Sequence, residues 1–277
     1  MKTALVLFVV GVLGMAAACS SSSPSIKPGS PAFFWAVAQE SYRIGDVAKA
    51  NSTLCEIAHS ENAFTVRARV WHLILSAGLS QGYSELADAY EAGATMNLTS
   101  PLRFRNEAAN LRSLAASAAL EFTQGVHETV KLHHDAQIAL AFPFPSGSDT
   151  EPESLQKIGY GIWIPDSDRE SLQTAMLRRG VLRAVSLAVG NPGDPNQAKA
   201  AFSTAVVQVP RATFLFEAAQ LLYKESDLFG PKRMDRPNRR MLLCSEALLA
   251  IRSIPETDET KQLAVQIQGT VKAIGGA

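Results

Sequence analysis

Three of the five histidines in this chain lie near carboxylates in one short segment, and they are the side chains best suited to chemistry. The segment contains His127, Glu128, His133, His134 and Asp135. Residues seven apart share a face of a helix, so His127 and His134 would point the same way, with Lys131 between them. Catalytic zinc helices instead place two histidines four residues apart. Because the spacing differs and a lysine opposes a bound cation, we predict a polar helix face and no metal site.

Three sequence motifs of common enzyme classes are absent from the chain. They are the phosphate-binding loop, the dinucleotide fingerprint and the zinc-knuckle spacing. We therefore expect no catalytic residue and no cofactor. A metal-dependent hydrolase that uses the segment from His127 to His134 is kept only as a distant alternative.

The composition is that of a chain with a substantial core. Of its 277 residues, 47% are hydrophobic and 19% are charged, so most of the chain can fold. The 26 basic residues balance the 26 acidic ones, which argues against nucleic acid as a partner. Three cysteines are too few for a disulfide framework. We expect Cys55 and Cys244, which lie among apolar neighbours, to be unpaired core residues.

Another chemical signal lies at the start of the chain, where small residues precede a cysteine. The apolar run from Ala4 to Met15 is shorter than the ~20 residues that span a bilayer, and three alanines separate it from Cys19. This pattern resembles the signal of bacterial lipoproteins. The resemblance implies that residues 1–18 are removed and that the sulfur of Cys19 carries a diacylglyceryl group. An ordinary secretory signal cut near Ala18 is the alternative.

Residues 19–30 read as a flexible tether. They are rich in serine and proline and cannot bury a core. In lipoproteins of Gram-negative bacteria, a serine after the cysteine usually goes with release to the outer membrane, and Ser20 occupies that position. We expect the protein to be held at the outer membrane, facing the periplasm, by acyl chains on Cys19.

Beyond the tether, apolar residues recur at helical spacing between glycine, proline and aspartate, and no convincing strand pattern appears. We therefore predict an all-α domain over residues 31–277. Ser100 before Pro101, and Asp194 before Pro195, are typical helix starts. The expected helices cover 31–44, 47–59, 62–80, 84–95, 101–122, 125–140, 167–190, 194–209, 211–228, 238–253 and 257–275.

A pattern of small and large residues recurs in the expected helix pairs. It comprises Gly193, Asp194, Ala198, Phe202, Ala205 and Pro210, and more briefly Gly45, Asp46, Ala50 and Leu54. This resembles the second half of a tetratricopeptide repeat (TPR), in which Gly-Asp forms the turn and the alanines permit close helix packing. The resemblance implies antiparallel helix pairs stacked as a TPR-like right-handed α-solenoid. A non-repetitive helical bundle is the alternative.

Two long interruptions break this pattern, near 141–166 and 229–238. The first carries Phe142, Phe144, Tyr160 and Trp163, which either bind a partner or fold back to plug a groove. Five basic residues lie in the second interruption or directly after it, and they are Lys232, Arg233, Arg236, Arg239 and Arg240. These basic residues could meet an acidic partner or the acidic stretch at 149–153, although a solvated surface loop is the commoner explanation.

Together these features predict a lipid-anchored protein of the bacterial envelope that acts as a non-catalytic scaffold for another envelope protein. The chain is also similar, at the level of its anchor and paired helices, to the helical T-component lipoproteins of TRAP-type periplasmic transporters. That resemblance implies a small hydrophobic or organic-acid ligand in place of a protein partner.

Overall fold

The structure, a computed structural model, describes residues 27–191, 193–202 and 206–276. The predicted signal, Cys19 and most of the tether lie outside the described residues. Within them the chain folds into ten α-helices, one short 3-10 helix and two four-residue strands. The predicted all-α class is therefore confirmed. None of these described helices is long and apolar enough to cross a bilayer.

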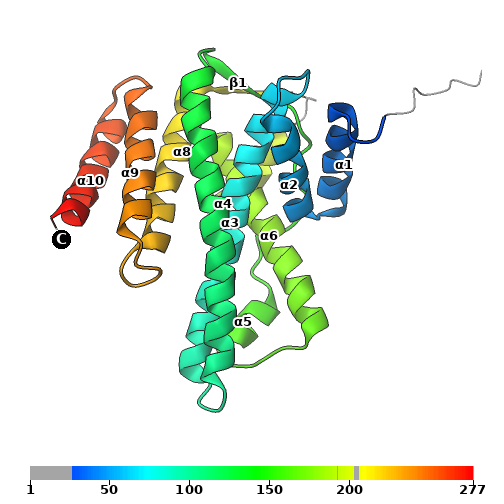
Figure 1. Ribbon diagram of the computed structural model, residues 1–277, viewed down its shortest axis with the longest axis vertical. Helices are drawn as coiled ribbons and strands as arrows, with labels where there is room; N and C mark the ends of the chain where they lie inside the picture. Colours follow the sequence, from blue (N-terminus) through cyan, green and yellow to red (C-terminus); the bar gives the residue numbers. More distant parts are fainter. Residues whose placement is uncertain (1–26, 192, 203–205, 277) are drawn as a thin grey trace, which may run out of the picture.

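The elements follow one another along the chain as shown in Figure 1. They are α1 (Pro31–Ile44), α2 (Val47–Ala58), α3 (Thr65–Met96), α4 (Pro101–Leu132), β1 (Gln137–Leu140), α5 (Glu153–Gly159), α6 (Asp166–Ala188), α7 (Pro195–Ala201), β2 (Val207–Pro210), α8 (Arg211–Glu225), η1 (Ser226–Phe229), α9 (Pro237–Arg252) and α10 (Asp258–Gly275).

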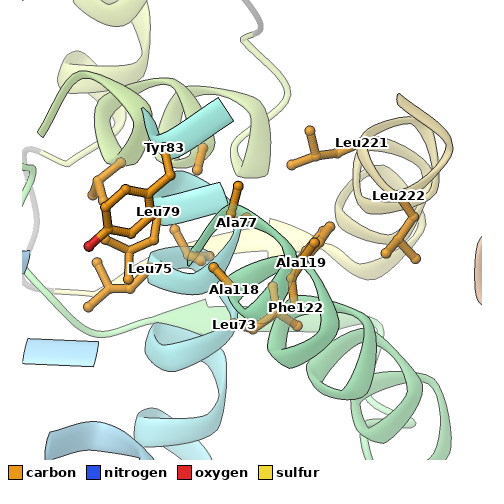
Figure 2. Close-up of a cluster of buried hydrophobic side chains, with 14 of the residues drawn as sticks. Leu73, Leu75, Ala77, Leu79, Tyr83, Ala118, Ala119, Phe122, Leu221 and Leu222 are labelled. Carbon is orange, nitrogen blue, oxygen red and sulfur yellow. The ribbon is translucent and has the colours of Figure 1, made fainter. Parts of the chain in front are cut away.

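A hairpin of two long helices, α3 and α4, runs through the centre of the molecule. α1 and α2 lie on one side of it, and α8, α9 and α10 lie on the other (Figure 1). Small buried residues of α4, among them Ala115 and Ala119, let the two helices approach closely. In Figure 2, Leu79 and Tyr83 of α3 lie on the side of that helix that faces away from Leu221 of α8.

The hairpin corrects part of the prediction. Each of its helices has 32 residues, or about 48 Å, where we expected a break near 81–83 in one and near 123–124 in the other. Gly82 lies in the gap between the expected helices 62–80 and 84–95, but it serves a helix crossing instead. A Cβ at Gly82 would lie 2.8 Å from the carbonyl oxygen of Met176 on α6. Glycine is needed there so that two backbones can meet, and the helix continues through it.

The crossing of α3 and α6 depends on two further glycines. A Cβ at Gly180 would lie 2.1 Å from the carbonyl oxygen of Gly78, and a Cβ at Gly78 would lie 2.5 Å from Cα of Val181. These distances are shorter than any contact between real atoms of this kind. The two helices therefore pack backbone against backbone.

Two strands replace the ends of two predicted helices. The helices expected at 125–140 and 194–209 end at Leu132 and Ala201, and β1 pairs with β2 in antiparallel register, Ile138 opposite Val209. Ile138, Leu140, Val207 and Val209 are buried while their neighbours in the strands are exposed. This alternation with β-branched residues suits a strand, and the pairing partner lies about seventy residues away.

The first helix pair matches its prediction closely. Gly45 ends α1 in the left-handed region at φ 84°, and Asp46 caps α2 by accepting a hydrogen bond from the amide of Lys49. Ala50 and Leu54 are fully buried. The start of α7 is also as expected, since Asp194 accepts from the amides of Asn196 and Gln197. Ser100 precedes α4, but its side chain makes no capping bond.

Candidate functional site

The histidines that opened the sequence analysis do not form one site. His127 Nδ1 lies 2.9 Å from Glu246 Oε2 and joins α4 to α9. His133 ends α4, and its carbonyl accepts a hydrogen bond from Arg211 Nε at 2.7 Å. Burial, with Arg69 and Arg211 nearby, lowers the pKa of His133. Among the described residues, no three His, Cys, Asp or Glu side chains are grouped to hold a metal ion.

Two of the four predicted partner-binding aromatics pack inward, near the start of the first interruption. Phe142 is 5% exposed and stacks on Trp71 of α3, with ring centroids 5.4 Å apart and an interplanar angle of 4°. Phe144 meets Phe202 edge to face at 5.4 Å. Side chains held this way have little surface left for a partner.

The acidic part of the same interruption is held by α6. Asp149 Oδ1 lies 3.3 Å from Arg179 Nε and 2.5 Å from Arg183 Nε. Both arginines also pair with Glu85 of α3. Asp149 therefore meets cations of α6, and Glu153, at the other end of the acidic stretch, pairs with Lys157 of α5. Within the described residues the acidic stretch forms no ion pair with the basic loop, which the sequence had offered as one option.

The other two aromatics lie at the far end of the hairpin. Trp163 packs edge to face against Phe104, and the guanidinium of Arg103 lies 3.7 Å from the centre of its ring. Tyr160 is 71% exposed. Asn97 Nδ2 donates to the carbonyl of Gly161 at 2.8 Å, which ties this segment to the turn between α3 and α4.

An exposed apolar patch covers this end of the molecule, and we call it the tip patch. Its members are all more than half exposed, and they are Met96, Leu98, Leu102, Tyr160 and Ile162. Residues 96–102 and 158–165, which form the two segments, contain no charged side chain. Contiguous exposed apolar side chains on a folded surface are typical of a contact site.

The five basic residues of the second interruption divide into two groups. Arg233 lies 2.8 Å from Asp88 of α3, and Arg240 lies 2.7 Å from Asp227 of η1. Lys232, Arg236 and Arg239 are exposed and form no ion pair with the part of the chain that the structure describes. Of the five, these three present free positive charge to solvent within the described chain.

A groove between α2 and α4, which the sequence did not predict, combines apolar and charged walls. It has a volume of about 740 Å³ and is floored by α3. We call it the α2–α4 groove and define it by Asn51, Cys55 and Glu56 of α2, Tyr83 of α3, and Leu114 and Glu121 of α4. Sites for small ligands commonly have this size.

Three buried polar residues of α2 and α3 meet the exposed Glu121 of α4 at the base of the groove. Asn51 Nδ2 donates to Glu121 Oε2 at 3.0 Å, and the Oδ1 of the same amide lies 2.8 Å from His72 Nδ1. Ser76 Oγ lies within hydrogen-bonding distance of both Asn51 Oδ1 and Glu121 Oε2. Because an amide oxygen only accepts, His72 carries its proton on Nδ1.

The titration of this network favours binding over nucleophilic chemistry. Burial lowers the pKa of His72, which outweighs the opposing effect of Glu121, so the imidazole is neutral at pH 7. Burial and the neighbouring carboxylates, Glu121 first among them, raise the pKa of the Cys55 thiol. A protonated thiol is a weak nucleophile. The prediction that both cysteines are core residues is correct for Cys244, which is buried, but Cys55 is only partly buried.

Sequence reasoning missed the groove because its parts are far apart in the chain. Asn51 and Glu121 are 70 positions apart, and no local motif links them. The one available signal was that His72 and Ser76, four residues apart, interrupt an apolar helix face. Such polar residues in a core require partners.

Comparison with known proteins does not relate this chain to a family. The tip patch and the α2–α4 groove are the two surface features whose chemistry bears on binding. No family model, no curated protein and no solved structure matches the chain.

Proposed function

We propose that this protein is a lipid-anchored, non-catalytic scaffold of the bacterial envelope that docks another envelope protein. The anchor is Cys19, placed at the outer membrane by the signal and tether that precede the folded domain. The observation that carries the proposal is the tip patch, which offers five exposed apolar side chains on two uncharged segments. Burying such side chains against a partner would stabilise a complex.

The position of the tip patch supports a protein partner over the anchoring membrane. α1, which follows the tether, lies in the upper half of Figure 1, whereas the α3–α4 turn forms the lower end. The tether joins the domain at α1, which is separate from the α3–α4 turn, so the tip patch does not border the point of attachment. The free cations Lys232, Arg236 and Arg239 offer a second, electrostatic contact for an acidic partner.

We also propose that the helices form antiparallel pairs stacked as a TPR-like right-handed α-solenoid. Support comes from α1 and α2. The Gly45-Asp46 turn joins the two helices, and Ala50 and Leu54 are buried, as expected for these positions of the repeat pattern. The right-handed solenoid over 31–277 stays a proposal. The long helices α3 and α4 each run through two of the expected helices, so support for the repeat is confined to the first pair.

A photo-crosslinking residue at position 98 tests the docking role. We expect it to capture one defined envelope protein in cells, and Ile162→Asp, another member of the tip patch, to abolish that capture. Val265→Asp is the matched control because Val265 of α10 is 67% exposed but lies outside the patch. Equal loss with both substitutions, or no captured protein, would contradict the scaffold function.

The anchor is tested separately. Mass spectrometry of the mature protein should find a diacylated Cys19 at its N-terminus, and Cys19→Ala should move the protein from the membrane to the soluble fraction. An unmodified mature protein that begins after Ala18 would instead support an ordinary secretory signal.

The α2–α4 groove favours a second candidate function, the binding of a small solute as in a TRAP T-component-like lipoprotein. The groove is large enough for a drug-sized molecule, and apolar and polar side chains both line it. Native mass spectrometry of the purified protein would test this function by detecting a bound small molecule.

A further inference from the structure

We propose that the α2–α4 groove binds a small organic cation, an ammonium group carried on an apolar body. This inference rests on the second candidate function, solute binding, and narrows it to one chemical class. It does not depend on the tip patch or on the lipid anchor.

The charge of the groove points to a cation. Glu56 and Glu121 both line it, whereas no lysine, arginine or histidine of the described chain does. Glu56 is exposed and forms no ion pair with the described residues. Two carboxylates in one concave surface raise the local concentration of cations and disfavour anions, including the organic acids that the transporter resemblance implies.

One carboxylate oxygen is held ready for a ligand. Glu121 Oε2 accepts hydrogen bonds from Asn51 and lies 4.0 Å from His72 Nε2, so this side of the carboxylate is fixed from below. The other oxygen, Oε1, has no partner within the described chain, and the side chain is 47% exposed. A positioned carboxylate with a free oxygen can accept from an ammonium group with little loss of side-chain entropy.

The remaining walls suit an apolar body. Leu114 is 40% exposed at the groove and supplies most of its apolar surface, while the largely buried Leu79, Tyr83 and Ala118 form the base beside the carboxylates. Figure 2 shows Leu79 and Tyr83 on the side of α3 that faces away from α8. A ligand with an apolar part and a positive end would bury the first on these side chains and pair the second with the carboxylates.

A smaller hollow adjoins the groove and, unlike the groove, is lined by a basic side chain. This hollow of about 400 Å³ shares Cys55 and Glu121 with the groove and is also lined by Arg69 and Glu128. Arg69 Nε donates to the carbonyl of Ala58 and lies 3.8 Å from Glu128. Since this cation already has partners, the carboxylates of the groove are left for a ligand.

Three probes with one apolar body and different charges test the proposal. They are 2-phenylethylammonium, 2-phenylethanol and 3-phenylpropionate, each titrated against the full chain, with affinity read from amide chemical shifts of the groove. Because exposed ion pairs are weak, we expect each carboxylate to supply roughly threefold in affinity. The cation should therefore bind about tenfold tighter than the alcohol, and the advantage should shrink with added salt.

Charge-removing variants locate the binding. Glu56→Gln and Glu121→Gln should each weaken the cation about threefold without affecting the alcohol. Glu61→Gln, which removes an exposed carboxylate outside the groove, should change neither. The side chain of Glu56 forms no hydrogen bond or ion pair with the described residues. Glu56→Gln therefore tests the inference even if Glu121→Gln disturbs the hydrogen-bond network of Asn51, His72 and Ser76.

The outcomes separate this inference from the functions above. Equal binding of the cation and the alcohol, or an unchanged affinity in Glu56→Gln, would overturn it. If 3-phenylpropionate binds tightest, solute binding stands but the preference for a cation is wrong. If no probe shifts the groove at about 10 mM, both the inference and the solute-binding function fail, while the scaffold function is untouched.

Discussion

The glycine crossing of α3 and α6 makes a prediction in which one substitution has opposite effects at two positions. In Gly180→Ala, the new Cβ would lie 2.1 Å from the carbonyl oxygen of Gly78 and 2.9 Å from the amide nitrogen of Gly82. Both atoms belong to the backbone of α3 and cannot rotate away, so the helices must separate. In Gly269→Ala on α10, nothing lies within 4 Å of the new Cβ.

The magnitudes follow from packing and helix propensity. Adding a methyl group to a packed interior costs about 1–3 kcal/mol, and contact with rigid backbone favours the upper value of ~3 kcal/mol. Alanine in place of a helical glycine returns about 1 kcal/mol. Gly180→Ala should therefore lower the free energy of unfolding by ~2 kcal/mol, a fall of roughly 4–8 °C in Tm. Gly269→Ala should raise it by about 1 kcal/mol.

Urea unfolding followed by circular dichroism measures both variants against the parent chain. The two substitutions should differ by ~3 kcal/mol although their chemistry is identical. A Gly180→Ala protein as stable as the parent would refute the backbone contact between α3 and α6. A destabilised Gly269→Ala protein would show that the helix-propensity part of the calculation is wrong.

Two further predictions concern a buried carboxyl and the first interruption. Burial raises the pKa of Glu225, which lies 2.5 Å from Ser80 Oγ, so its stabilising contribution is full below the ordinary value of 4.5 and is lost as pH rises through the raised value. Glu225→Gln should therefore gain stability relative to the parent as pH rises above 4.5 in urea titrations, and a constant difference would contradict the assignment. Phe142→Ala should cost about 3–5 kcal/mol because the ring is buried on Trp71, whereas Tyr160→Ala should stay within ~0.5 kcal/mol. Equal losses in thermal unfolding would be inconsistent with the inward packing of Phe142.

The fate of the predicted binding residues has one physical cause. Phe142 and Phe144 follow β1 directly, so the pairing of β1 with β2 brings them to Trp71 and Phe202. Tyr160 follows α5 at the end of the hairpin, where there is no further layer to cover it. An aromatic residue in a long connection is therefore a partner candidate only where the fold leaves it uncovered.

The sequence by itself determined the all-α class and many helix ends. The turn at Gly45 and Asp46 and the start of α7 at Asp194 depend on a backbone conformation and on hydrogen bonds that span two or three residues. Interactions of such short range can be read from neighbouring residues, because no distant partner is needed to satisfy them.

Only the tertiary structure decided the features on which the binding proposals depend. Gly82 could mark a turn or a helix crossing, and the presence of α6 against it selects the crossing. The carboxylate of Glu121 faces a groove only because Asn51, 70 positions away, supports it from α2. Contacts of this kind form when separate helices pack together, so their chemistry is set by which surfaces meet and is not encoded in any local spacing.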